Sequence, residues 1–373
     1  MDFISLTKTL ISIPSVATSE ESYENIAKYL QTEIQKFGIN SRLVITEPTK
    51  IENSDFECFY DKNLISLLTP KIPKYNVIAS YGNGSFHLIM SAHFDTVTID
   101  TDSNQKWSYP PFVGKISNGT LYGLGAADNK SGIGIALGVL DKIRGNFEDK
   151  ISITFLFTGD EEIGGYSGIG YLLNNELSTA DLFISLNGSF DRINIGCYGR
   201  LWIHFVSNQE ICTFILSHRL ELNQILKSHD IPLRFSHIEA SRDESTVLVF
   251  DSLTSNFDQK LIKQVFHEFL PNITFELEIL GFIKPSISSK SFYAKTFTKI
   301  ANKHLTEKQT IKIGAPSDLR FAINKNIPSL SFGPIQSTSN VHKPNENVKI
   351  ETINSCIEIA SDFILSLKSE KEV

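Results

Sequence analysis

The chain has 373 residues, 41% of them hydrophobic, which is enough material for more than one hydrophobic core. Its formal net charge of -7 and its lack of a long basic run argue against nucleic acid and membrane surfaces as partners, and favour small molecules or short peptides. The four cysteines show no Cys-x-x-Cys spacing, which argues against a disulfide framework. Because the sequence shows neither a signal-peptide pattern nor an apolar segment of membrane-spanning length, we expect a soluble cytoplasmic protein.

The amino-terminal part of the chain predicts helices over 3–13 and 23–37, followed by short strands at 41–47, 64–68 and 76–80. The continuous apolar run at 86–92 predicts a buried strand that ends at His93 and Asp95. Side chains of a strand alternate, so these two residues share a face, as a metal-bound imidazole and its supporting carboxylate would. A hydrogen-bonded structural histidine is the more common alternative.

Asp128 lies in a glycine-rich stretch, GLGAADNKSG, directly before a predicted apolar helix at 133–143. One interpretation is a helix N-cap, which aspartate commonly provides at such a position. The other is a carboxylate that bridges two metal ions, with the glycines allowing close backbone approach. On these residues alone, the cap is the favoured interpretation.

The run ISITFLF at 151–157 predicts a central strand buried on both faces, followed by Gly159 and the pair Glu161 and Glu162. Functional sites of open α/β sheets lie past the carboxyl ends of the strands. Consecutive side chains leave a strand end in different directions, so one glutamate can ligate a metal while the other handles protons on a water. A solvated acidic turn is the alternative, and for an isolated acidic run it is the better one.

Strands near residues 90, 155, 185 and 330 all end at polar or glycine-rich loops, which is typical of a mainly parallel sheet with helical crossovers. Between them the order becomes βαββαβ, as in a ferredoxin-like domain: strand 201–206, helix 213–228, strands 233–238 and 246–251, helix 259–269 and strand 274–279. Helices at 290–304 and 353–367 and a strand at 329–332 then complete the sheet domain. We therefore expect an α/β fold in which residues 1–199 and 286–373 form a mainly parallel-sheet domain around a ferredoxin-like insert at 200–285.

Six stretches, in order, resemble the zinc-dependent aminoacylase and exopeptidase family that includes acetylornithine deacetylase, succinyl-diaminopimelate desuccinylase, tripeptidase T and bacterial glutamate carboxypeptidase. They are SAHFDTV, WSYPPFVGKISNGTLYGLGAADNKSG, FTGDEEIGG, GAPSDLRFA, IPSLSFGP and NVHKPNENV. They span nearly the whole of both segments outside the insert, which the resemblance makes the catalytic domain. The insert would then be a lid or a dimerisation surface, and a homodimer through it is one alternative.

The resemblance implies a metal centre of one or two zinc ions, with cobalt or manganese as alternatives. Its implied ligands are His93, Asp128 as the bridging carboxylate, Glu162 and His342. Asp95 would support His93, and Glu161 would be the general base that takes a proton from the metal-activated water. The resemblance also implies a cis peptide bond between Asp128 and Asn129.

The sequence departs from the family pattern at Asn187, where relatives carry an acidic ligand. An amide oxygen is a neutral, weaker ligand, so we expect the ion held by His93, Asn187 and Asp128 to be the looser one, and a single zinc is an alternative. Asp191 is a less favoured substitute ligand.

The insert departs from the family pattern too. It lacks the family's histidine for the developing oxyanion, and His204, His218, His229 and His237 fit ordinary structural positions better. The family's arginine for a substrate carboxylate has no match either; the remaining candidates are Arg234, Arg242 and Arg320.

The leading hypothesis is a zinc-dependent hydrolase that cleaves an amide or peptide bond of a short peptide or N-acyl amino acid. The alternative is a catalytically weakened relative that works as a binding or regulatory protein. A phosphate-binding role for GLGAADNKSG is disfavoured because Lys130-Ser131 lacks the glycine spacing of a phosphate loop.

Overall fold

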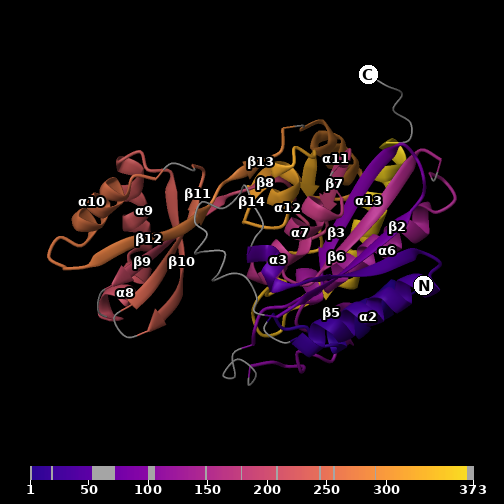
Figure 1. The fold of residues 1–373 in the computed structure, drawn as a ribbon, viewed down its shortest axis with the longest axis horizontal. Coiled ribbons are helices and arrows are strands. Elements are labelled where there is room, and N and C mark those ends of the chain that lie inside the picture. The colour runs from indigo at the N-terminus through magenta and orange to yellow at the C-terminus, as the bar shows by residue number, and fades with distance from the viewer. Residues whose placement is uncertain are drawn as a thin grey trace.

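The computed structural model describes residues 2–17, 20–52, 72–99, 106–147, 149–177, 179–206, 209–242, 245–254, 257–289 and 291–367. The strand expected at 64–68 lies outside these ranges, as does the side chain of Arg242. The described chain forms a large α/β body and a smaller group of elements beside it (Figure 1).

Parallel strands form the centre of a nine-stranded sheet in the described part of the body, ordered β1-β2-β6-β3-β7-β15-β8-β13, with β14 beside β8. The parallel strands are β6 (Ile151–Thr158), β3 (Phe86–His93), β7 (Leu182–Ser185) and β15 (Ser329–Ser331). The predicted mainly parallel centre is therefore confirmed. Because parallel strands end at the same edge of a sheet, the residues that follow β3, β6 and β7 lie close together.

Antiparallel or short strands complete the sheet on both sides. β1 (Asn40–Thr46) and β2 (Lys74–Tyr81) form an antiparallel edge next to β6. On the other side lie β8 (Arg192–Cys197), β13 (Ser286–Ile287) and β14 (Thr310–Gly314), none of which was predicted. These strands are short and only partly apolar, so their pairing with neighbours, rather than their own sequence pattern, defines them.

Helices cover both faces of the sheet. One face packs against α1 (Phe3–Ser12), α2 (Glu20–Lys36), α6 (Ser131–Ile143), α11 (Ser291–His304) and α13 (Ile350–Leu367). The other packs against α7 (Tyr171–Asn175) and α12 (Leu319–Asn324), near the short α3 (Pro48–Glu52). Phe155 and Phe157 belong to the first core and Leu156 to the second, so the prediction of a strand buried on both faces is confirmed. Within the described ranges, no helix has both the length and the apolarity to cross a bilayer.

A small sheet brings the loop that contains His342 close to the start of α6. β4 (Lys115–Ser117) and β5 (Thr120–Tyr122) form a hairpin whose turn residues, Asn118 and Gly119, both have positive φ, as an Asn-Gly turn requires. β16 (Asn347–Lys349) pairs with β5. This pairing places the loop containing His342 beside the stretch that precedes α6.

The smaller group of elements has its own sheet and its own core. Its order is β9 (Gly199–Val206), α8 (Gln209–Ser217), α9 (Arg219–Ser228), β10 (Leu233–Arg242), β11 (Ser245–Ser252), α10 (Gln259–Phe269) and β12 (Glu276–Ile283). The strands pair antiparallel in the order β10-β11-β9-β12 over an apolar core that includes Phe205, Phe250 and Phe266.

One helix prediction was wrong in extent. The helix expected over 213–228 is broken into α8 and α9 at His218, where the Ser217 hydroxyl donates to the main-chain carbonyl of Thr213 and so competes with the helix backbone. The short α7 follows an irregular turn, η3 (Tyr166–Gly170), that contains glycines.

Candidate active site

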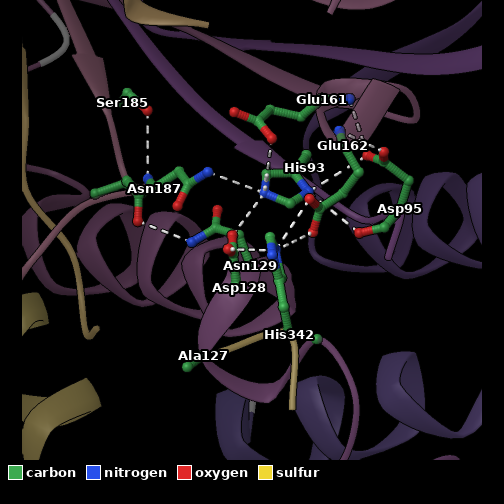
Figure 2. Close-up of polar contacts among 12 residues, drawn as sticks. His93, Asp95, Ala127, Asp128, Asn129, Glu161, Glu162, Ser185, Asn187 and His342 are labelled. Carbon is green, nitrogen blue, oxygen red and sulfur yellow. Dashed lines mark hydrogen bonds and ion pairs between the residues drawn. The ribbon is translucent and has the colours of Figure 1, made fainter. Parts of the chain in front are cut away.

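Six predicted site residues converge where the parallel strands end: His93, Asp128, Glu161, Glu162, Asn187 and His342 (Figure 2). They come from the ends of β3, β6 and β7, from the turn before α6 and from the loop before β16. Residues more than 200 positions apart in the sequence therefore share one site.

Asp128 lies between the two histidines. Its Oδ1 is 3.0 Å from Nε2 of His93, and its Oδ2 is 3.3 Å from Nε2 of His342. Nε2 of His342 is also 3.1 Å from the carboxylate of Glu162. The side chain of Asp128 caps no helix, because α6 begins at Ser131 without a side-chain cap, so the N-cap interpretation was wrong. The Asp128–Asn129 peptide bond is cis, as expected.

The geometry of these side chains fits a divalent metal ion. Ligand atoms of His93, Asp128 and Glu162 all lie within 4.8 Å of one another. Around a tetrahedral zinc ion with bonds of about 2.0–2.2 Å, neighbouring ligand atoms are about 3.3–3.6 Å apart. The 3.0 Å between His93 and Asp128 lies just below this range and the 4.8 Å limit lies above it, so small side-chain shifts in both directions would bring the atoms to these spacings. Nδ2 of Asn187 lies 3.0 Å from Nε2 of His93, and a half-turn of the amide would present its oxygen there instead.

Asp95 supports both sides of this centre. Its fully buried carboxylate accepts the backbone N–H of Glu161 at 3.2 Å and that of Glu162 at 3.0 Å. Its Oδ1 also lies 3.3 Å from Nδ1 of His93. A hydrogen bond at Nδ1 leaves Nε2 directed at the centre, so one carboxylate orients the histidine and holds the turn η2 (Glu161–Ile163).

Glu161 lies beside the centre rather than within its closest contacts. Its carboxylate is 4.0 Å from Nε2 of His93 and lines a cavity of about 880 Å³. Burial raises its pKa above the ordinary glutamate value. A carboxylate with this placement can accept a proton from a water molecule in the cavity.

Burial and the close spacing of carboxylates and histidines shift the pKa values of the site residues. Burial raises the pKa of Glu162 to about 8, and hydrogen bonds to Asp128 and Glu162 raise the pKa of His342 to about 11. Burial would lower the pKa of His93, but its bonds to Asp128 and Asp95 raise it well above the ordinary value. Without metal, protons on these two histidines thus occupy the ring nitrogens that would bind a metal ion.

Basic side chains also line this cavity. Its lining includes Arg192, Arg200, Arg234 and Lys312, from both the body and the smaller group of elements. Asp251 lies 2.7 Å from the guanidinium of Arg234 and 3.6 Å from that of Arg200. The single carboxylate of Asp251 thus faces two guanidinium groups, which leaves an excess of positive charge on this side of the cavity. Arg200 was not anticipated from the sequence, whereas Arg234 was a candidate; His237 also lines this cavity.

Arg320, the other candidate for a substrate carboxylate, is engaged with the protein itself. Its side chain is buried and donates to the main-chain carbonyls of Ser317 and Gly164. It therefore ties α12 to the turn that carries the glutamate pair. Asp191, the proposed substitute ligand, is exposed and pairs with Arg192 at 3.5 Å.

Two buried charged residues next to the site were missed. Glu346 accepts backbone N–H groups from the stretch before Asn129, and Lys130 donates from Nζ to the carbonyls of Leu10 and Ile13, both at 2.9 Å. Burial lowers the pKa of Lys130 to about 7. Both residues lie within the stretches that carry the family resemblance, but a single glutamate or lysine there has no spacing that sets it apart from a surface residue.

Residues 89–366 match the family described as Peptidase family M20/M25/M40. The chain belongs to this family. It is 25% identical to succinyl-diaminopimelate desuccinylase from Ehrlichia canis (strain Jake), over 98% of both chains. The predicted family and the predicted class, a hydrolase of metallopeptidase or amidohydrolase type, are therefore confirmed.

Solved structures show the same M20 fold. An M20 family metallo-carboxypeptidase from Sulfolobus solfataricus superposes with a TM-score of 0.68 at 18% identity, covering 98% of this chain and 99% of the other. The di-peptidase Dug1p from Saccharomyces cerevisiae superposes with a TM-score of 0.71 at 13% identity, covering 99% and 96%. These matches extend over both the body and the smaller group of elements of this M20 chain.

Proposed function

We propose that this M20 chain hydrolyses an amide or peptide bond of a short peptide or N-acyl amino acid with metal-activated water. The observation that carries the proposal is the placement of Asp128 between His93 and His342, with Glu161 beside them in the lining of an 880 Å³ cavity. A hydrolytic metal site needs such ligands together with a nearby base and room for substrate.

The chain's residues would divide the work as follows. The metal would be held by His93, Asp128, Glu162, His342 and, more weakly, Asn187. When bound, zinc supplies Lewis acidity and lowers the pKa of water to about 7; cobalt and manganese suit similar donors. Glu161 accepts the proton of the attacking water and passes it to the leaving amine.

We propose that the metal position at Asp128, Glu162 and His342 is the tighter one. The other position would rely on the neutral amide oxygen of Asn187 beside His93 and Asp128. A carboxylate attracts a divalent cation more strongly than an amide, so the second position would fill only at higher metal concentration.

The arginines that line the cavity support a substrate with a free carboxylate. Arg200 and Arg234 face the single carboxylate of Asp251, which leaves an excess of positive charge. A carboxylate on the substrate would complete the pairing, since guanidinium groups favour bidentate contacts with carboxylates. Short peptides and N-acyl amino acids both carry one.

We propose the domain limits 1–199 and 286–373 for the catalytic domain and 200–285 for a ferredoxin-like insert. The antiparallel order β10-β11-β9-β12 and the separate apolar core support this division. Because Arg200, Trp202 and Arg234 line the cavity, the insert would act as a lid over the substrate. Its role in a homodimer stays a prediction.

A mixed panel of dipeptides, tripeptides and N-acyl amino acids, assayed with and without a chelator, tests the proposal. We expect turnover that the chelator abolishes and added zinc restores, and we expect less turnover of amide-capped versions of the same substrates. Absence of chelator-sensitive turnover on every member would contradict the proposed hydrolysis and favour a binding role.

A further inference from the structure

Glu346 gathers the backbone N–H groups of the stretch that carries Asp128. Its Oε1 accepts from Ala127 at 2.9 Å and from Asp128 at 3.0 Å, and its Oε2 accepts from Gly125 at 3.0 Å. Its main-chain carbonyl accepts the N–H of Gly123, also at 3.0 Å. In the described structure, one residue thus satisfies four donors of residues 123–128.

These donors need a partner that the local backbone does not supply. Gly125 has a left-handed φ of 79°, and Asp128 has non-helical angles of φ -125° and ψ 85°. Gly125, Ala127 and Asp128 are buried, so their N–H groups would be costly to leave without an acceptor. The carboxylate of Glu346, itself only 1% exposed, fills this place as an anion surrounded by N–H groups.

The same residue links the two sides of the metal centre. Glu346 follows His342 by four positions and directly precedes β16, whose pairing with β5 anchors the loop. His342 contacts Asp128 at 3.3 Å, and Glu346 holds the backbone of Asp128 from 218 positions away in the chain. Glu346 therefore fixes the distance between Asp128 and His342.

We propose that Glu346 is a positioning residue that sets the geometry of Asp128 and His342 and thereby the affinity of the metal centre. The inference rests on the proposed metal-dependent function. Residues that orient metal ligands through hydrogen bonds typically contribute about 10- to 100-fold to metal affinity or activity. Glu346 touches no substrate, so its effect acts through Asp128 and His342.

The test compares Glu346→Gln with Glu346→Asp and a matched control, Asp181→Asn. In glutamine, an NH₂ group replaces one acceptor oxygen, so at least one of the three backbone N–H groups meets another donor. Asp181 also accepts a backbone N–H, from His87 at 2.7 Å, but at the opposite end of β3. Glu346→Gln and Asp181→Asn both lose a carboxylate that accepts a backbone N–H, but only Glu346 lies beside the proposed metal centre.

The measurements are the zinc dissociation constant, by competition with a chromophoric chelator, and the melting temperature of the metal-free protein. We expect Glu346→Gln to bind zinc about 10- to 100-fold more weakly than wild type and Glu346→Asp to fall between them. Asp181→Asn should bind zinc as wild type does, even where its melting temperature falls.

Wild-type zinc affinity in folded Glu346→Gln, or an equal loss in Asp181→Asn, would overturn the inference. If Glu346→Gln does not fold, Glu346→Asp decides: weaker zinc binding supports the role and unchanged binding refutes it. Failure of the wild-type protein to bind zinc would instead contradict the proposed function itself, so the two failures are distinguishable.

Discussion

Nε2 of His342 lies 3.3 Å from Oδ2 of Asp128, so a loop near the end of the chain meets the turn that precedes α6. The other oxygen of Asp128 faces His93 at 3.0 Å. This one carboxylate therefore links the two histidines of the site.

Replacing the proposed base, Glu161→Gln, should lower kcat by about 10²- to 10⁴-fold, because glutamine cannot accept the proton of the attacking water. Metal content, measured by elemental analysis, should stay at the wild-type level. Glu351→Gln, on the exposed first turn of α13, is the control and should leave both values unchanged. A metal-loaded, fully active Glu161→Gln protein would remove Glu161 from this role.

Asp95→Asn should weaken zinc binding and lower kcat, each by about 10- to 100-fold. Asparagine keeps one acceptor oxygen, whereas Asp95 accepts the N–H groups of both Glu161 and Glu162 and also faces His93. Zinc titration and steady-state kinetics check this. Wild-type values in both would show that the carboxylate is not needed to hold the histidine and the turn.

Asn187→Asp should raise the number of zinc ions retained after dialysis from about one to about two, because a carboxylate binds the cation more strongly than an amide. Elemental analysis of protein purified without added metal measures the ratio. The prediction is wrong if the wild-type chain already retains two tightly held ions.

Zinc affinity should rise with pH and fall as the solution becomes acidic. Without metal, His342 holds its proton at neutral pH because its pKa is raised to about 11, and the pKa of His93 is raised too. Both must lose a proton before they can ligate an ion, so binding at pH 7 should release protons. Calorimetry in buffers of different ionisation enthalpy measures that release; an affinity that is flat between pH 6 and 8 would contradict it.

Arg234→Met should raise KM about tenfold for substrates with a free carboxylate, since it removes one guanidinium from the basic wall beside Asp251. Amide-capped substrates should show no such change. The control is Arg219→Met, at the start of α9, where the arginine donates to the main-chain carbonyl of Leu216. An equal rise in KM for capped and uncapped substrates would show that Arg234 does not bind the substrate carboxylate.

Much of the fold could be predicted because strong local patterns specify it. The continuous apolar run of β6 predicts burial on both faces, and the structure shows Phe155 and Leu156 in different cores. β8 and β14 could not be predicted, because the long-range pairing that defines them leaves no clear period in their own residues. The break at His218 was missed since it depends on local side-chain bonds rather than on apolar spacing.

The sequence by itself determined the buried parallel strands, most of the helices, the family and the kinds of side chain available for a metal site. It also placed His93 and Asp95 on one face, because period-two alternation is a local property. Only the tertiary structure decided that Arg320 is engaged with Gly164, that Arg200 and Arg234 face Asp251, and that Glu346 holds the backbone of Asp128. These contacts join residues far apart in the chain, and a partner chosen by packing leaves no periodic signal in the sequence.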